Sequence, residues 1–382
     1  MKILIVHRLL GRFGGAHKYL LGLIEVLRQN KWEVALAINE CPDLVDLLET
    51  ASDLGAKIVV SDFDNLPSER SSDELGYLID ELQPNLIDFQ AASKCIRSAA
   101  LGCRALRSSS AVKLFSMHLP IVTDHSNLHR NRRLIPWTEE NKSLKERTEF
   151  LSLFDTGMSV SNYHAGVITK LLNLPSRFFT FLPNGVDIIR FSPKETRLES
   201  QDMPRIVACG GLTKQKRFDL LIDAGALLRD RGTSFEIVIA GEGADRPELE
   251  NQIRSLNLGE CVTLAGHIDD VASFLRSGDI YVLCSDTEGF PFATLEAMSC
   301  GLPSVVTNPG DLPLVVREGF EGRVVNCGDT LALSDSILEL VENPELRRTM
   351  GESARRRVLE MYDSRVTWRD TLEFYEDLVR EK

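Results

Sequence analysis

The chain of 382 residues is long enough for two or three domains, and its composition, 43% hydrophobic and 26% charged, is that of an ordinary globular protein. It contains no apolar run of the roughly 18 residues that a membrane span requires, and Met1–His7 is typical of a short strand rather than a signal peptide. The net charge of −12 argues against nucleic acid binding, and eight cysteines without a Cys-x-x-Cys pair indicate a reducing cytoplasm, with no zinc site or disulfide framework.

Short apolar runs that alternate with helical patterns predict a series of buried strands. In the first half we expect strands at Ile3–Val6, Glu33–Ile38, Lys57–Val60, Leu86–Phe89, Lys113–Met117, Thr156–Val160 and Phe178–Leu182. In the second half we expect them at Arg205–Ala208, Phe235–Ala240, Cys261–Leu264, Ile280–Cys284, Ser304–Thr307 and Gly322–Val325. Between them lie helical stretches such as Ala16–Asn30, whose apolar residues recur at helical spacing. This alternation predicts parallel sheets covered by helices on both faces.

A polar stretch, Pro193–Pro204, is the best candidate for a linker and divides the chain into halves of similar size. We therefore predict an α/β protein with two doubly wound, Rossmann-like domains, at residues 1–190 and 191–363, followed by a helical tail at 364–382. Ligands of such sheets bind beyond the carboxyl ends of the strands, so we expect the two domains to face each other across a cleft.

The charge is unevenly distributed: residues 1–190 carry 22 basic and 22 acidic residues, and residues 191–382 carry 22 and 34. Within the first half, residues 94–133 carry one acid, Asp124, and eight basic residues: Lys94, Arg97, Arg104, Arg107, Lys113, Arg130, Arg132 and Arg133. The first four recur at offsets of 3, 10 and 13, as on one face of a helix. Such a cluster would suit peripheral contact with an anionic membrane, but a solvated basic face explains it at least as well.

The segment Ser285–Pro303 is the most informative motif. Glu288 and Glu296, separated by seven residues, flank a Gly-Phe-Pro turn that opens a helix directly after the strand Ile280–Cys284. A turn of this kind presents free backbone N–H groups to an anion, whereas carboxylates accept hydrogen bonds from sugar hydroxyls. The segment therefore indicates a ligand with both a phosphate and sugar hydroxyls, which describes a nucleotide-sugar.

Two further loops of the second half follow strands. The segment Ala208–Phe218 contains two glycines and Lys216, a combination that suits a diphosphate, although a plain turn with surface lysines is an equal alternative. Gly241 and Gly243 follow the next strand and are weak evidence by themselves.

The first strand is followed by Gly11, Gly14 and Gly15, which precede a helix. Their spacing is not that of the dinucleotide fingerprint, and only Glu40 lies near the place of a ribose-binding acid, so a nicotinamide enzyme is disfavoured.

His118 closes the strand Lys113–Met117, where it could bind a sugar hydroxyl or move a proton, although a structural histidine is the commoner case. Asp62 and Asp64 form an Asp-x-Asp pair, but nothing else in the sequence suggests a metal.

In this order, these motifs resemble the GT-B glycosyltransferases, in particular the large retaining family 4 (glycosyl transferases group 1). The resemblance covers nearly the whole chain and is densest over residues 155–327. It rests on the Glu-x7-Glu pair, Pro183–Asp187 followed by Phe191–Pro193, the loop Gly210–Lys216, the turn Gly14–Ala16 and His118.

The resemblance implies roles for these residues. Glu296 would bind the ribose hydroxyls, Glu288 would face the donor sugar, and Lys216 would hold the diphosphate. The implied donor-binding set is Gly15, Gly211, Lys216, Gly241, Gly243, Glu288, Gly289, Phe290, Pro291, Thr294 and Glu296, and the implied catalytic set is His118, Glu288 and Lys216. Such enzymes need no metal and no cofactor besides the donor, and their tail, here residues 364–382, packs back on the first domain.

The sequence departs from the family pattern at three places: Gly211 replaces an arginine of the phosphate loop, His17 replaces a frequent acid, and Gln90 stands where a histidine is common. Lys214 lies three residues after Gly211, but a lysine does not replace an arginine that makes two parallel hydrogen bonds.

The resulting prediction is a retaining hexosyltransferase that uses a nucleoside-diphosphate sugar and a hydroxyl acceptor. A non-hydrolysing sugar-nucleotide epimerase and a non-catalytic binding protein of the same fold are the alternatives.

Overall fold

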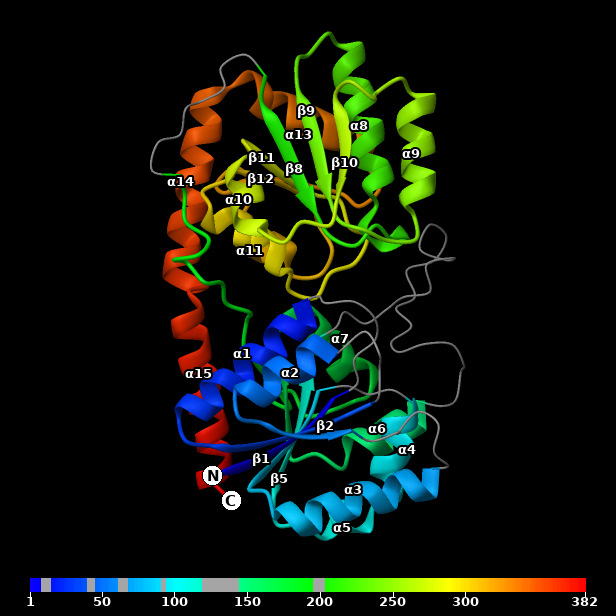
Figure 1. Cartoon of the computed structure of the whole chain (residues 1–382), viewed down its shortest axis with the longest axis vertical. Coiled ribbons are helices and arrows are strands. Elements are labelled where there is room, and N and C mark those ends of the chain that lie inside the picture. The colour runs from blue at the N-terminus through cyan, green and yellow to red at the C-terminus, as the bar shows by residue number, and fades with distance from the viewer. Residues whose placement is uncertain (8–14, 40–44, 61–67, 91–93, 119–143, 195–202) are drawn as a thin grey trace. The chain divides into compact units, whose positions relative to one another are not determined.

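A computed structural model describes residues 1–7, 15–39, 45–60, 68–90, 94–118, 144–194 and 203–382 of the chain. The described residues form two compact units. Unit 1 comprises Met1–Pro183 and Thr367–Lys382, and unit 2 comprises Asn184–Val366. The chain thus leaves unit 1 once, forms unit 2, and returns with its final residues (Figure 1). Pro193–Pro204, predicted as the linker, lies within the range of unit 2.

Unit 1 alternates strands and helices along the chain. Its elements are β1 (Lys2–His7), α1 (Gly15–Gln29), β2 (Glu33–Ile38), α2 (Val45–Asp53), β3 (Lys57–Val60), α3 (Ser68–Leu82), β4 (Leu86–Phe89), α4 (Lys94–Gly102), α5 (Arg104–Ser108), β5 (Val112–Met117), α6 (Leu144–Leu151), β6 (Thr156–Ser159), α7 (Asn162–Leu171) and β7 (Phe179–Phe181). Within the described residues, the strands form one seven-stranded parallel sheet in the order β3-β2-β1-β4-β5-β6-β7.

Both faces of the unit 1 sheet are covered. Leu4 and Val6 of β1 belong to a core that includes Leu75 of α3 and Phe150 of α6. Successive residues of a strand point to opposite faces, so the equally buried Ile3 and its alternate neighbours face the other side. Figure 1 shows α1 and α2 on one side of this sheet and α3 and α5 on the other.

Helix α15 (Ser364–Arg380) completes unit 1 at the end of the chain. Trp368 of α15 packs on Tyr19 of α1, with ring centroids 4.9 Å apart. It also lies over Gly22, where an added Cβ would stand 2.6 Å from the indole ring. Tyr375 lies about two turns after Trp368, is fully buried, and reaches the sheet. The absence of a side chain at Gly22 therefore lets α15 pack closely on α1.

Unit 2 repeats the same alternation. Its elements are β8 (Arg205–Cys209), the 3₁₀ helix η3 (Lys214–Lys216), α8 (Phe218–Asp230), β9 (Glu236–Ala240), α9 (Arg246–Ser255), β10 (Val262–Gly266), α10 (Val271–Arg276), β11 (Ile280–Leu283), α11 (Phe292–Ser299), β12 (Ser304–Thr307), α12 (Leu312–Val315), β13 (Gly322–Val325), α13 (Thr330–Glu342) and α14 (Pro344–Met361). In the described part of unit 2, a parallel six-stranded sheet runs in the order β10-β9-β8-β11-β12-β13.

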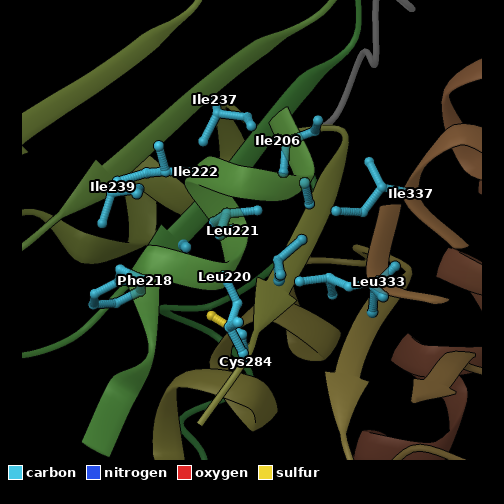
Figure 2. Packing of buried hydrophobic residues seen from close by; sticks show 14 of the residues in the cluster. Ile206, Phe218, Leu220, Leu221, Ile222, Ile237, Ile239, Cys284, Leu333 and Ile337 are labelled. Atoms are coloured by element: carbon cyan, nitrogen blue, oxygen red, sulfur yellow. The ribbon is translucent and has the colours of Figure 1, made fainter. Parts of the chain in front are cut away.

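A large apolar core fixes α8 and α13 on one face of the unit 2 sheet. Figure 2 shows Leu221 of α8 in the same apolar cluster as the strand residues Ile206 and Ile237 and the α13 residue Ile337. The strand residues are fully buried, as continuous apolar strands covered by helices should be. On the other face, α11 packs against α10 and α14. Because helices cover both faces, only the edges of the sheet at the strand ends are left for a ligand.

The predicted fold class is confirmed: both units are doubly wound α/β structures, and every predicted strand is present. Glu33–Ile38, Lys57–Val60, Leu86–Phe89, Ser304–Thr307 and Gly322–Val325 have the predicted bounds, and the other strands differ only at their ends.

The predicted basic helical face is wrong for the residues that the structure describes. The helix breaks at Cys103, whose Sγ accepts the Leu106 N–H and caps α5, so Arg97 and Arg104 lie on different helices. Arg97 is buried and lies 3.8 Å from Glu146. Lys113 is buried too, and its Nζ donates to the Ser109 carbonyl. Arg130, Arg132 and Arg133 lie outside the described residues, as does the side chain of Lys94.

Candidate functional site

The strand order of unit 2 places two predicted loops side by side. β8 and β11 are neighbours in the sheet although they are not consecutive in the chain, with Ile206 opposite Ile280. This is the point where the strand order reverses, and in open α/β sheets ligands bind outside the carboxyl ends of the strands at such a point. We call residues 210–217, which follow β8, the Lys216 loop, and residues 284–291, which follow β11, the Glu288 turn. The two loops are therefore where a ligand of unit 2 is expected.

Lys216 and Glu288 meet across this point. Lys216 Nζ lies 2.5 Å from Glu288 Oε1, and the two side chains are 22% and 9% exposed. Such a charge-assisted pair in a partly buried place fixes both side chains more firmly than a surface ion pair does. Lys214, the other lysine of η3, instead pairs with Glu248 of α9 and lies 3.7 Å from Asp245. The lysine that pairs with Glu288 is therefore Lys216 and not Lys214.

The remaining predicted residues of this segment lie in the Glu288 turn and the first half of α11. Pro291 occupies the N-cap position, and no side chain caps the helix within the described residues, so backbone N–H groups of its first turn stay available. Thr294 and Glu296 are both buried in α11. Gly289 and Phe290 precede the helix, and the Phe290 ring packs on Tyr362, with centroids 5.5 Å apart.

Asn184 holds the Glu288 turn from outside the predicted set. Its Nδ2 donates to the Phe290 carbonyl over 2.7 Å, and the residue is buried. Asn184 belongs to the segment Pro183–Asp187, which contributes to the family resemblance, but the sequence does not predict its contact with Phe290.

The glycines of the two loops that follow β8 and β9 differ in what surrounds them. A Cβ at Gly241 would stand 1.9 Å from the Gly210 carbonyl oxygen, and one at Gly243 would stand 2.2 Å from the Leu212 oxygen. Gly241 also has a φ of +144°, which favours glycine. At Gly211, by contrast, the nearest atom to an added Cβ is 3.7 Å away. Gly241 and Gly243 let two backbones approach, whereas an added Cβ at Gly211 would make only ordinary van der Waals contacts.

In unit 1 the corresponding edge carries histidines. His7 ends β1, and His118 directly follows β5. Within the described residues, no ring nitrogen of either histidine has a hydrogen-bond partner, and all four are buried. The His118 ring stacks on Tyr19, with centroids 4.0 Å apart. Burial, and secondarily a neighbouring histidine, lowers the pKa of each to about 3, so both are neutral near pH 7.

Beneath this edge lies a buried carboxylate that the sequence did not reveal. Asp88 of β4 is fully buried and accepts hydrogen bonds from Ser116 Oγ (2.5 Å), Gln90 Nε2 (2.8 Å) and the Tyr375 hydroxyl (2.8 Å). Burial raises the pKa of Asp88 to about 6 although the three donors oppose the shift. Gln90, predicted as a departure from the family pattern, is therefore a structural partner of Asp88. Because β4 was predicted as a buried strand, the sequence indicates that the Asp88 side chain is buried. No sequence pattern predicts its hydrogen bond with Tyr375.

Several predicted residues can be placed only in part. Gly15 is the first residue of α1, and Gly11, Gly14, Glu40, Asp62 and Asp64 lie outside the described residues. His17 is buried on α1, and burial lowers its pKa. In the described part of the chain, no group of three or more His, Cys, Asp or Glu residues is placed to hold a metal ion. No described helix is long and apolar enough to cross a membrane.

Residues 192–357, which lie within unit 2, match the family described as glycosyl transferases group 1. Among curated proteins, the chain is 32% identical over 176 residues to N-acetyl-alpha-D-glucosaminyl L-malate synthase of Bacillus anthracis, covering 46% of each protein. It is 32% identical over 155 residues to alpha-D-kanosaminyltransferase of Streptomyces kanamyceticus, covering 40% of each. The chain thus spans less than half the length of these relatives.

Solved structures match over the whole length at low identity. Sucrose-phosphate synthase from Thermosynechococcus elongatus superposes with a TM-score of 0.82 at 18% identity and covers 100% of both chains. Anabaena HepE in complex with UDP gives a TM-score of 0.80 at 18% identity, over 99% of this chain and 100% of that one. These similarities show the fold, which is the GT-B fold of two Rossmann-like units. The sequence similarity to glycosyl transferases group 1 covers residues 192–357 of unit 2.

Proposed function

We propose that the chain is a retaining glycosyltransferase that moves a hexose-type sugar from a nucleoside-diphosphate sugar to an acceptor hydroxyl, in the synthesis of a glycan, glycolipid or glycosylated natural product. The observation that carries the proposal is the Lys216–Glu288 pair at the reversal point of unit 2, beside the uncapped start of α11. Both residues lie in the stretch that matches glycosyl transferases group 1. The binding of UDP by Anabaena HepE, which shares the fold, supports a nucleotide donor.

The donor would bind with its diphosphate between Lys216 and the first turn of α11. An ammonium group has three N–H donors, so Lys216 can keep Glu288 and still donate to a phosphate oxygen. The free N–H groups of the α11 turn would face the other phosphate oxygens. Glu288 would then accept from the donor sugar, and the buried Glu296 would accept from the ribose hydroxyls. Gly15, Gly211, Gly241 and Gly243 would complete the backbone that lies near the phosphates.

In the proposed reaction, the bond between C1 of the sugar and the diphosphate oxygen breaks, and the acceptor oxygen bonds to C1 on the same face. The acceptor proton passes to the departing phosphate oxygen. Lys216 and the α11 N–H groups stabilise the negative charge that develops there, which is the largest single contribution in many such reactions. His118 of unit 1 would donate to a sugar hydroxyl as a neutral imidazole, since burial keeps its pKa low. We propose neither a metal nor a cofactor besides the donor.

The test is release of nucleoside diphosphate from a panel of nucleotide-sugars with pooled acceptors. Lys216→Met should lower kcat/KM for the donor by about 100-fold, because a preorganised cation at the leaving group is lost. Lys214→Met is the matched control, since Lys214 lies on the same 3₁₀ helix but pairs with Glu248. Turnover by Lys216→Met at the parental rate would show that the site has been wrongly assigned.

Other measurements on the same panel of nucleotide-sugars separate the alternatives. Formation of an epimer without any acceptor would identify an isomerase. Tight donor binding without turnover on any acceptor would identify a binding protein. An inverted product linkage would leave glycosyl transfer standing and remove the retaining mechanism.

We also propose that the protein works in the reducing cytoplasm. The six cysteines whose side chains the structure describes are free, and Cys284 and Cys300 are buried.

A further inference from the structure

We infer that Arg217 and Asp286 are positioning residues of the unit 2 site, and that their ion pair holds the Lys216 loop against the Glu288 turn. The inference rests on the proposed function, because the pair would act by keeping Lys216 and Glu288 in register for the donor diphosphate. Neither residue belongs to the set predicted from the sequence.

The two loops are joined by hydrogen bonds beside the Lys216–Glu288 pair. The Asp286 N–H donates to the Gln215 carbonyl over 2.9 Å, and Gln215 Nε2 donates to the Thr287 carbonyl over 2.8 Å. Cys284 Sγ donates to the Arg217 carbonyl over 3.0 Å. These contacts set the register of one loop on the other, so that a displacement of either loop would separate Lys216 from Glu288.

Arg217 adds the only ion pair besides Lys216–Glu288 that links the two loops within the described residues. Its Nη1 donates to both carboxylate oxygens of Asp286, each over 3.2 Å, and its Nε donates to Asp219 Oδ1 over 3.0 Å. The Arg217 and Asp286 side chains are only 17% and 15% exposed, whereas Asp219 is 43% exposed. A planar guanidinium that contacts two carboxylates has little freedom to turn, which suits a brace between loops.

The pair also neutralises a charge in the Glu288 turn. Asp286 stands two residues before Glu288 in the sequence, and its carboxylate would repel an anionic ligand of the turn if it were unpaired. Because Arg217 holds both Asp286 oxygens, Lys216 is left to Glu288 and to the proposed diphosphate.

The backbone of Arg217 supports a role for its side chain. Arg217 has φ 51° and ψ 40°, the left-handed conformation, directly after Lys216 and before α8. A residue with a Cβ adopts this conformation at a cost, and glycine adopts it freely. Strained residues of this kind persist where the surrounding contacts hold them, often at functional sites. Here the contacts are those of the guanidinium with Asp286 and Asp219.

The experiment compares Asp286→Asn with Asp219→Asn in the full chain. Both remove one carboxylate partner of Arg217 and leave the backbone conformations unchanged, but only Asp286 lies in the Glu288 turn. Hydrogen exchange followed by mass spectrometry should show faster exchange in residues 210–217 and 284–291 for Asp286→Asn, by about tenfold, and a clearly smaller increase there for Asp219→Asn, which leaves the two loops joined. Equal exchange in the parent and Asp286→Asn, or the same increase in Asp219→Asn, would overturn the inference.

Kinetics provide a second measurement that a merely structural role would not reproduce. Asp286→Asn and Arg217→Gly should each raise the donor KM and lower donor kcat/KM by about tenfold, since misplacing a cation by a fraction of an ångström is costly, while the acceptor KM stays the same. The double variant should be no worse than Arg217→Gly, because the two residues act as one unit. Arg217→Lys, which keeps the charge but not the fork, should recover part of the loss. Additive effects, or parental kinetics in Asp286→Asn, would contradict the inference.

The outcomes distinguish the two proposals. If the parent neither binds nor turns over nucleotide-sugars, the proposed function fails, and hydrogen exchange still decides whether the pair fixes the loops. If the parent is active and Asp286→Asn exchanges and reacts like it, the function stands and the inference is wrong.

Discussion

At the scale of single residues, the loops of unit 2 separate glycines that are required from one that is not. Gly241 and Gly243 lie where a Cβ would overlap the carbonyl oxygens of Gly210 and Leu212, so they are explained by the close approach of two backbones. Their predicted part in donor binding stays a prediction. At Gly211, where the family pattern has an arginine, an added Cβ would make only ordinary van der Waals contacts, and the backbone accepts other residues. The packing around position 211 therefore does not require glycine and leaves room for the arginine of the family pattern.

Restoring that cation gives the first prediction. Gly211→Arg should be tolerated by the fold and should tighten the binding of UDP or another matching nucleoside diphosphate by about tenfold, since a hydrogen bond to a charged group is worth about 1.5 kcal/mol or more. Isothermal titration calorimetry measures the effect. Gly241→Ala is the opposing control, because its Cβ would stand 1.9 Å from a carbonyl oxygen and should destabilise unit 2. A Gly211→Arg variant that folds and binds more weakly than the parent would contradict the expected geometry.

The sequence allowed Lys216 and Glu288 to be picked out, since each follows a recognisable strand. It did not allow the partners of Arg217 to be predicted. Arg217 and Asp286 are 69 residues apart, and they meet only because β8 and β11 are neighbours in the sheet. Strand order depends on packing of the whole sheet and is not written in any local pattern. The same reason explains why Asp88 and Tyr375 were missed.

At the scale of elements, α15 is bound to unit 1 by a polar contact as well as by apolar packing. The Tyr375 hydroxyl donates to Asp88 inside the sheet, and Trp368 covers Gly22 of α1. A buried carboxylate needs all its donors, because an ionised group without partners is costly in an apolar surrounding. A helical tail was predicted at residues 364–382, and α15 spans Ser364–Arg380, but its hydrogen bond to β4 was not predicted.

Removing one hydroxyl tests this attachment. Tyr375→Phe should lower the free energy of unfolding of unit 1 by about 1–3 kcal/mol, because Asp88 loses a donor that nothing replaces. All three tryptophans of the chain, Trp32, Trp137 and Trp368, belong to unit 1, so urea unfolding followed by tryptophan fluorescence reports on that unit. Tyr77→Phe, at a tyrosine of α3 that is 68% exposed, is the control and should change nothing. Equal losses from both variants would exclude a special role of the buried contact.

At the scale of the whole molecule, acid should act on unit 1 through groups of opposite effect. The folded unit keeps His7 and His118 neutral with pKa values of about 3, against 6.5 in the unfolded chain. As the pH falls below 6.5 the unfolded chain therefore takes up protons that the folded unit does not, and stability is lost. The pKa of Asp88 is about 6 in the folded unit and 3.8 when unfolded, so between these values the folded unit takes up the extra proton and stability is gained.

The slope of stability with pH measures this balance. From these three groups, unit 1 should lose about 1.4 kcal/mol for each pH unit between about 6 and 4, since two protons favour the unfolded chain and one favours the folded unit. Asp88→Asn removes the opposing proton and should steepen the loss by about 1.4 kcal/mol per pH unit. Urea unfolding by tryptophan fluorescence at pH 6, 5 and 4 gives both slopes, and other titrating groups cancel in their difference. Identical slopes would show that Asp88 does not titrate in this range.

The organisation into two α/β units was predictable because their buried strands are continuous apolar runs separated by helical patterns. The burial of Arg97 was not predictable, because spacing alone does not reveal that one helix ends at Gly102 and that Cys103 caps another, which begins at Arg104. The boundary between the units at Pro183 was not predictable either. The polar stretch Pro193–Pro204 lies within the range of unit 2, so a change in composition does not mark the place where the packing of unit 1 ends.

The return of α15 to unit 1 has a consequence for how the chain is made. Tyr375 is translated 287 residues after Asp88, and at roughly 5–20 residues per second the interval is roughly 15–60 s. During that time the emerging unit 1 has its β4 carboxylate without the tyrosine and its α1 surface without Trp368. Unit 2 can fold on the ribosome as soon as its own sequence has emerged, but unit 1 stays incomplete until α15 has emerged as well. Unit 1, whose strands precede unit 2 in the chain, is therefore completed after unit 2.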